Sequence, residues 1–206
     1  MLRATCIIFA VFFVVNMSSA TNITDGKRAE NFIELLSSEV LELTQNRSLT
    51  TEHRRQKFGN LVEKSFDLPL IARFVLGRPW NSATLAQRKE YLELFMEIVE
   101  LTYSKRFMEY SGQTIMVTGH ALGKRKFILV NSQLSNPTKE TANLKVVWRL
   151  IPRKNSFKII DVAIEGISMA ITKRNEYSSV IQRSGGQLSA LLDAMRKQIA
   201  KLKKTS

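Results

Sequence analysis

The chain of 206 residues contains one cysteine, Cys6, and two histidines, His53 and His120. One cysteine cannot form a disulfide within the chain, and no group of cysteine and histidine has the spacing of a zinc or iron–sulfur site. We place His53 on a polar helix and His120 in a turn between strands. Nine glycines and four prolines are too few for a collagen-like or low-complexity chain. We therefore expect one globular unit without a metal or other cofactor.

Catalytic motifs are also scarce. The segment 166–170 has the G-x-S-x-A spacing of a hydrolase nucleophile elbow around Ser168. The hydrolase fold that uses this motif needs a histidine further along the chain, and none follows here. The sequence has no P-loop and no G-x-G-x-x-G fingerprint, so no nucleotide site is indicated. We interpret Asp161 and Glu165 as exposed salt-bridge residues on the outer face of a strand rather than as a catalytic carboxylate pair. The protein is not predicted to be an enzyme.

The longest apolar run lies at the amino terminus. Residues 4–15 carry no charge and follow Arg3, and Ser18 and Ala20 are the small residues that signal peptidase accepts. The run is shorter than the about 20 residues needed to cross a bilayer. We predict a cleaved signal peptide over residues 1–20 and a single domain over residues 21–206. An uncleaved membrane anchor is the alternative.

Acidic residues are outnumbered, with 31 Lys and Arg against 18 Asp and Glu and a formal net charge of +13. This charge favours an anionic partner or surface. The basic clusters lack the neighbouring aromatic side chains on which nucleic-acid bases stack, and an export signal argues against a nucleic-acid partner. We expect a solvated basic surface, or attraction to anionic lipid surfaces or to an acidic protein.

The hydrophobic periodicity changes twice along the chain. We predict capping by Asp67 and a capping box formed by Thr84 and Gln87. The fold class is α+β: a curved four-stranded antiparallel sheet with helices packed over one face, forming an apolar pocket. The predicted helices are 28–45, 51–65, 67–76, 84–110, 173–184 and 187–203, and the predicted strands are 113–119, 125–134, 143–152 and 157–167.

Alternation is clearest in the last two strands. It places Asp161 on the outer face, opposite to the apolar residues of its strand. Arg149 and Asp161 become cross-strand neighbours on that face if Ile151 lies opposite Ile159. Such an exposed pair is expected to contribute about 0.2–1 kcal/mol.

Three segments carry a family resemblance. Residues 66–80 (FDLPLIARFVLGRPW) are similar to the signature F-D…I-A-R-x-V-L-G-x-x-W, and residues 146–150 (VVWRL) are similar to V-D-W-R-L. Residues 158–168 (KIIDVAIEGIS) are similar to K-I-x-D-V-x-V-E-G-V-S. In this order and spacing, from about residue 28 to 198, the chain resembles the MlaC or toluene-tolerance family of periplasmic phospholipid-binding proteins. Val147 departs from the pattern, because the family usually has Asp there.

The resemblance implies a soluble, monomeric carrier in the periplasm that binds glycerophospholipid by its acyl chains. It implies two docking partners, an outer-membrane lipoprotein–porin complex and an inner-membrane ABC transporter complex. Two other classes stay open: a small-molecule enzyme of a similar α+β cone fold, and an exported interaction module with a closed core.

The predicted lipid-binding residues come from the inward face of the sheet and from the helices expected to face it. Each of them could instead belong to an ordinary closed core. They are Phe74, Phe95, Val99, Tyr103, Val146, Trp148, Leu150, Ile160, Val162 and Ile164.

Overall fold

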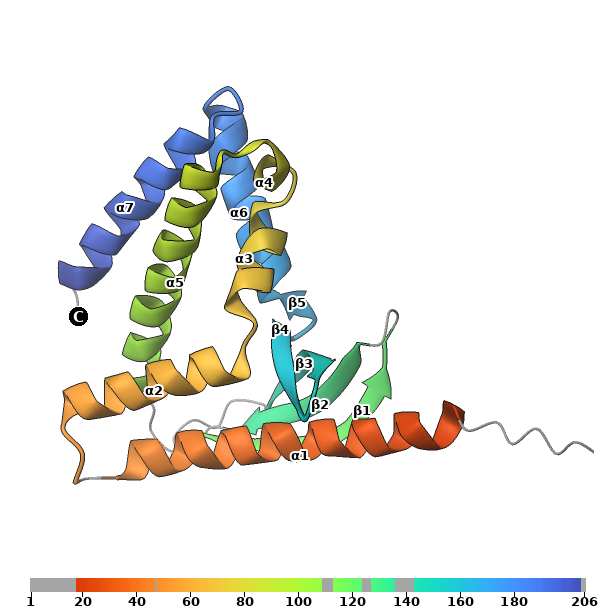
Figure 1. Ribbon diagram of the computed structural model, residues 1–206. Coiled ribbons are helices and arrows are strands. Elements are labelled where there is room, and N and C mark those ends of the chain that lie inside the picture. The colour runs from red at the N-terminus through yellow and green to blue at the C-terminus, as the bar shows by residue number, and fades with distance from the viewer. Residues whose placement is uncertain (1–17, 47, 109–112, 124–126, 136–142, 205–206) are drawn as a thin grey trace, which may run out of the picture.

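The computed structural model describes residues 18–46, 48–108, 113–123, 127–135 and 143–204. These residues form helices and one antiparallel sheet, as the sequence predicts (Figure 1). The helices are α1 (Ser18–Gln45), α2 (Thr51–Ser65), α3 (Leu68–Leu76), α4 (Pro79–Ser82), α5 (Leu85–Met108), α6 (Met169–Arg183) and α7 (Leu188–Lys204). The strands are β1 (Thr114–Leu122), β2 (Ile128–Ser135), β3 (Leu144–Arg153), β4 (Ser156–Ile164) and β5 (Ile167–Ser168).

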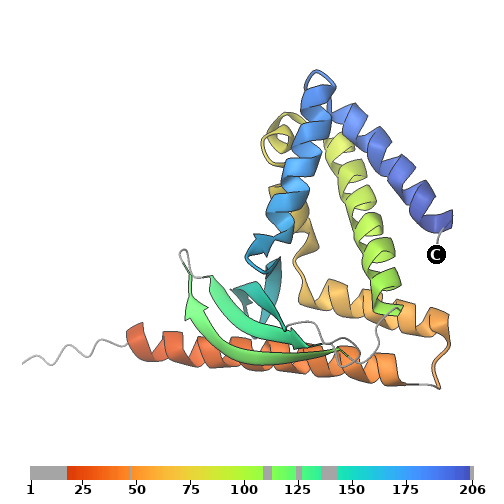
Figure 2. The same cartoon turned by 180° about the vertical axis from the view of Figure 1, so that it is seen from behind.

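Helix α1 and the other long helices occupy different parts of the molecule. Figures 1 and 2 show α1 running along the sheet, with β1 and β2 curving beside it. Helices α3, α5, α6 and α7 rise away from this layer as a separate group, and α2 connects the two parts. The sheet is therefore covered by α1 rather than by the helical group as a whole.

The sheet has five strands in the order β1-β2-β3-β4-β5, so the prediction of four was wrong. The predicted strand 157–167 divides because Glu165 and Gly166 adopt positive φ angles of 49° and 79°. Such backbone favours a tight turn over a continuing strand. The chain therefore reverses, and Ile167 pairs with Ile164.

A bulge interrupts the pairing of β3 with β4. Arg149 lies opposite Asp161, as predicted, but the next pair along the ladder is Leu150 with Ile159. Ile160 is the extra residue of β4 and has no partner in this register. The predicted pairing of Ile151 with Ile159 was consequently wrong by one residue, since Ile151 lies opposite Lys158.

Two apolar clusters form the core. In the first, Ala29 and Ile33 of α1 pack against the sheet, where Val130, Leu150 and Ile159 are fully buried. The second lies within the helical group and includes residues of α3, α5, α6 and α7. The apolar stripes of the long helices thus pack in two separate hydrophobic cores.

Several helix ends confirm the expected capping. The Thr84 amide donates to Gln87 Oε1 at 3.0 Å, and the Gln87 amide donates to Thr84 Oγ1 at 3.2 Å. The Leu70 amide donates to Asp67 Oδ1 at 3.1 Å. Pro79 begins the short helix α4, a position that suits proline.

Hydrogen bonds attach the junction between α2 and α3 to β4. The Asp67 amide donates to the carbonyl of Ile159 at 3.0 Å. Lys158 Nζ donates to the carbonyls of Glu63 and Lys64, at 2.8 and 2.7 Å. An ammonium group at these carbonyls satisfies the end of α2 and complements the helix dipole. The position of α2 beside the sheet is therefore set by contacts to its backbone.

Of the predicted signal peptide, residues 1–17 lie outside the described residues. Residues 18–20 are the first of α1. None of the helices within the described ranges is long and apolar enough to cross a membrane.

Candidate functional site

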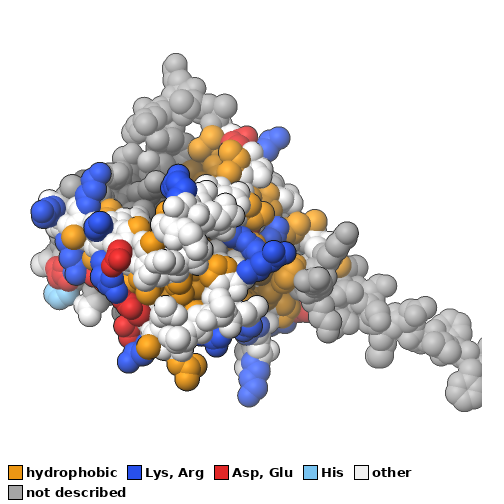
Figure 3. Space-filling model, turned by 90° about the horizontal axis from the view of Figure 1, so that it is seen from above, with side chains coloured by type: hydrophobic (Ala, Val, Ile, Leu, Met, Phe, Trp, Pro, Cys, Tyr) orange, Lys and Arg blue, Asp and Glu red, His pale blue; other side chains and the backbone are white. Residues whose placement is uncertain are grey.

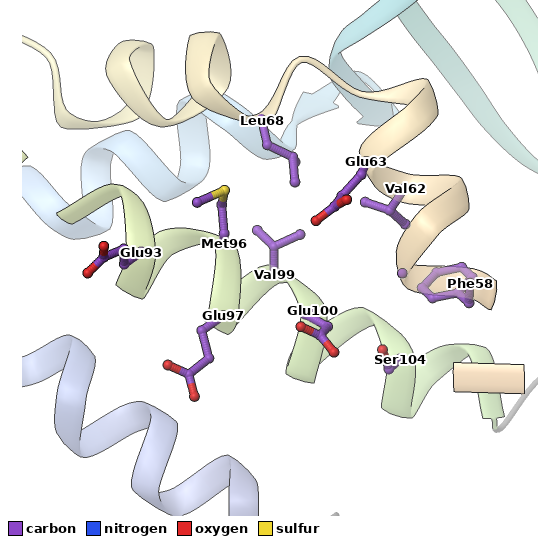
Figure 4. Close-up of a pocket in the computed structure, with 11 residues that line it drawn as sticks. Phe58, Val62, Glu63, Leu68, Glu93, Met96, Glu97, Val99, Glu100 and Ser104 are labelled. Carbon is purple, nitrogen blue, oxygen red and sulfur yellow. The ribbon is translucent and has the colours of Figure 1, made fainter. Parts of the chain in front are cut away.

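A pocket of about 300 Å³ lies between α2 and α5, beside the start of α3. Figure 4 shows Val62, Leu68 and Val99 pointing toward one another from these three helices. Phe58 and Met96 extend the apolar wall along α2 and α5. Its volume is at the lower end of the roughly 300–1,000 Å³ typical of ligand sites. The wall suits hydrocarbon better than a polar ligand.

Carboxylates surround the apolar wall, and two of those on α5 lie near cations. Glu97 Oε1 lies 2.7 Å from Lys203 Nζ. Glu100 Oε1 lies 3.9 Å from Arg55 Nη1. These pairs are exposed, so each contributes little to stability, but they reduce the negative charge at the rim. The carboxylates lining the pocket are Glu63, Glu93, Glu97 and Glu100.

Ser104 is the buried polar residue of the pocket. The residue is 4% exposed, and its Oγ has no hydrogen-bond partner among the described residues. A buried hydroxyl without a partner costs about 1–3 kcal/mol, which a ligand oxygen or a water molecule would remove. The sequence analysis missed this residue. A serine among the apolar residues of a long helix was the available signal.

The predicted helix residues do not converge on one site. Val99 lines the α2–α5 pocket. Phe95 is buried in the helical group, with its ring centroid 5.9 Å from that of Tyr91. Phe74 and Tyr103 are each 41% exposed. The structure therefore brings one of these four residues to the pocket.

Three of the six predicted sheet residues, Trp148, Leu150 and Val162, pack in the cluster that the sheet forms with α1. Val146 and Leu150 are buried, while Trp148 and Val162 pack against the cluster formed with α1. Trp148 Nε1 donates to Ser132 Oγ at 2.9 Å, which anchors the indole within the sheet. The alternation was right for these residues, yet a helix that the sequence analysis did not assign to this face fills the space over it. Lipid contact at this face stays a prediction.

The last two predicted sheet residues lie on β4. Ile164 pairs with Val146 and is partly buried. Ile160 is the bulge residue, and its neighbour Ile159 takes the buried position in the α1 cluster. The bulge shifts the alternation by one residue, which sequence periodicity does not reveal.

Asp161 is 6% exposed, so its predicted exposure was wrong. Ser168 Oγ donates to Asp161 Oδ2 at 2.6 Å, and the Ala170 amide donates to Oδ1 at 3.1 Å. Arg149 Nη1 lies 3.6 Å from Oδ2, which confirms the predicted pairing. Ser168 also accepts from the Ile171 amide as the N-cap of α6. The G-x-S-x-A serine therefore begins a helix, which is its structural role here.

His120 lies in β1 rather than in a turn, so this prediction was also wrong. Its Nδ1 is 2.6 Å from Glu30 Oε1, and Lys27 Nζ donates to Glu30 Oε2 at 2.6 Å. Lys27 first, and then His120, lower the pKa of Glu30 from its usual value. A side chain on Gly26 would clash with the imidazole, so glycine permits this close approach of α1 to β1.

No group of three or more His, Cys, Asp or Glu side chains could hold a metal ion in the part of the chain that the structure describes. The structure thus defines a small α+β protein with a helix-lined apolar pocket. The family model for the MlaC protein matches residues 34–197, and the chain belongs to the MlaC family. This confirms the resemblance drawn from the sequence.

A solved structure has the same fold. It is the phospholipid-binding protein from Ralstonia solanacearum, in complex with a phospholipid. The two chains are 22% identical, and the match covers 85% of this chain and 98% of that one with a TM-score of 0.71. At this identity the likeness shows the fold.

Proposed function

We propose that this protein binds glycerophospholipid by its acyl chains and carries it through the periplasm. The apolar α2–α5 pocket, in a chain of the MlaC family, is the observation on which the proposal rests. The neighbour from Ralstonia solanacearum supports it, because that protein was solved with a phospholipid. The proposal makes the protein a carrier without a cofactor and not an enzyme.

Acyl chains must be shielded from water during transport, because burying each methylene lowers the free energy by about 0.8 kcal/mol. Two sixteen-carbon chains therefore represent on the order of 25 kcal/mol. A dry protein pocket retains most of this energy, so exchange between bilayer and carrier is nearly balanced. ATP hydrolysis by the ABC transporter would then be needed to give lipid transport a direction, and not to hold the lipid in the carrier.

The pocket volume of about 300 Å³ is small for both acyl chains of a diacyl lipid in the described conformation. We expect α2 to move away from α5 when a second chain enters. The contacts between these helices include the stacked rings of Phe58 and Phe107, whose centroids are 4.3 Å apart. The exposed pair of Arg55 and Glu100 adds little that would oppose this movement.

The proposed cellular setting is the periplasm, after removal of residues 1–20. The carrier would act as a monomer between an outer-membrane lipoprotein–porin complex and an inner-membrane ABC transporter complex. Nucleic acid is not among the proposed partners. The family membership supports this setting.

Native mass spectrometry with lipid extraction tests the proposal on the mature protein. We expect a diacyl phospholipid to co-purify. Lipid-free protein from a membrane-bearing host, without uptake from liposomes, would contradict the proposal and favour an enzyme or a closed-core interaction module.

The pocket itself is tested by Val99→Trp, which fills it. If overpacking of about 1–3 kcal/mol opposes binding, the affinity for lipid should fall by about 5-fold to 150-fold. Leu85→Trp is the matched control, because Leu85 is 82% exposed and lies outside the pocket lining. Full lipid occupancy in a folded Val99→Trp protein would exclude this pocket as the site.

A further inference from the structure

Helices α3 and α6 expose apolar side chains outside the proposed lipid pocket. Leu70 and Phe74 on α3 are each 41% exposed. Ile171 on α6 is 47% exposed, and Ile167, just before α6, is 60% exposed. Together with Arg174 of α6, these four residues are named here the α3–α6 surface. Large apolar side chains exposed together mark an interaction site more often than single ones do.

Four of the five residues of the α3–α6 surface, those on the two helices, belong to one face. Leu70 and Phe74 are four residues apart on α3, and Ile171 and Arg174 are three apart on α6, so each pair shares a helix face. The guanidinium carbon of Arg174 lies 5.0 Å from the centre of the Phe74 ring, which joins the two pairs. Figures 1 and 2 both show α3 and α6 side by side.

The two helices of this surface carry more positive than negative charge. Helix α3 contains Arg73 and no carboxylate. The single carboxylate of α6, Glu176, already binds Lys173 at 2.6 Å. At the start of α3, Asp67 is likewise bound, with Arg153 Nη2 2.6 Å from its Oδ2. Figure 3 shows Lys and Arg side chains, together with fewer Asp and Glu, beside hydrophobic ones on the face seen from above.

We propose that the α3–α6 surface docks the protein on an anionic lipid bilayer. The apolar side chains enter the boundary between headgroups and acyl chains, and the guanidinium groups meet the lipid phosphates. Exposed apolar side chains can insert into the hydrocarbon of a bilayer without needing a pocket of complementary shape. The net charge of +13 attracts the whole molecule to such a surface from a distance. This inference goes beyond lipid carriage, because it concerns the surface on which the protein docks.

Co-sedimentation of the mature protein with vesicles tests the proposal. Vesicles of phosphatidylglycerol mixed with phosphatidylcholine are compared with vesicles of phosphatidylcholine alone. The protein should bind the anionic vesicles, and added salt should weaken the binding. The double variant Phe74→Ser/Ile171→Ser should bind them about tenfold or more weakly, because it loses two inserted side chains.

Two controls match these changes. Leu85→Ser removes an 82% exposed leucine from outside the surface. Arg174→Gln is paired with Arg183→Gln, which removes the same charge from the last turn of the same helix. Binding should fall for Arg174→Gln and remain near the original value for Leu85→Ser and Arg183→Gln.

Phospholipid content and thermal midpoint are measured on each variant. Unchanged lipid content with reduced vesicle binding supports docking as a property separate from the pocket. Equal vesicle binding by the double variant and the original protein would overturn the proposal, as would equal losses in the controls. A double variant that binds vesicles normally but loses an acidic protein partner would also overturn it and assign the surface to that partner.

Discussion

At the scale of single residues, Asp161 joins three parts of the molecule. Its carboxylate accepts hydrogen bonds from Ser168, before α6, and from the Ala170 amide within α6. Arg149 of β3 approaches the same carboxylate from the neighbouring strand. A negative charge at the first turn of α6 also complements the helix dipole. Asp161 thereby holds the helical group to the sheet.

Replacing Asp161 with alanine should lower the free energy of unfolding by about 1–3 kcal/mol, because two donors lose their acceptor. Urea unfolding monitored by circular dichroism measures this change. Asp161→Asn keeps one carbonyl oxygen and should lose less. Equal stability of the alanine variant and the original protein would show that water replaces the carboxylate at no cost.

The contact between Glu30 and His120 makes stability depend on pH. Lys27 and His120 hold the pKa of Glu30 below its usual value of 4.5 in the folded protein. A carboxyl group with a lowered folded-state pKa stabilises the protein above the unfolded pKa. That stabilisation is lost as the pH falls through the folded pKa.

The variant Glu30→Gln should therefore be less stable than the original protein at neutral pH. The difference between the two should shrink as the pH falls from about 5 to about 3, because Glu30 becomes protonated. Urea unfolding of both proteins across this range measures it. A constant difference would mean that shape rather than charge is responsible.

At the scale of elements, α1 determines that the apolar face of the sheet is a closed core. Ala29 and Ile33 of α1 are fully buried against it. Val162 lies among the residues that pack against this cluster. The face is therefore a packed interior in the described structure, whereas the α2–α5 pocket is an open apolar space.

Val162→Asp should consequently lower the thermal midpoint sharply, because a charge placed against this interior without a partner costs several kcal/mol. Leu122→Asp is the control, since Leu122 is a strand residue that is 55% exposed. Its midpoint should stay near that of the original protein. Loss of lipid by Val162→Asp with a nearly unchanged midpoint would instead show that acyl chains reach this face.

At the scale of the whole molecule, two apolar clusters stabilise separate parts. Ile33 and Ile159 belong to the α1–sheet cluster, whereas Ile199 belongs to the helical group. Substitutions at distant sites usually add within about 0.3–0.5 kcal/mol, but neighbouring sites interact.

Ile33→Val and Ile199→Val should each cost about 0.5–1.5 kcal/mol and add without coupling. Ile33→Val combined with Ile159→Val, within one cluster, should deviate from additivity. Urea unfolding of the single and double variants measures both double-mutant cycles, Ile33 with Ile199 and Ile33 with Ile159. Coupling between Ile33 and Ile199 above about 1 kcal/mol would show that the clusters act as one interior.

Local signals predicted much of the fold, but of the predicted binding residues only Val99 lines the α2–α5 pocket. The capping box of Thr84 and Gln87 was correct, because its contacts lie within one helix turn. The fifth strand was missed because the positive φ angle of Glu165 is unusual for a residue with a side chain. The bulge at Ile160 was missed because alternation assumes an unbroken ladder.

The sequence by itself determined the α+β class, the order of most elements and the MlaC family, since periodicity, caps and motif order are properties of neighbouring residues. Tertiary structure alone decided which apolar face is closed and which is open. The alternation around Leu150 cannot distinguish a face covered by α1 from one facing a pocket, because both exclude water equally. Only the placement of α2 against α5 brings Phe58, Val99 and Ser104 together around an open space.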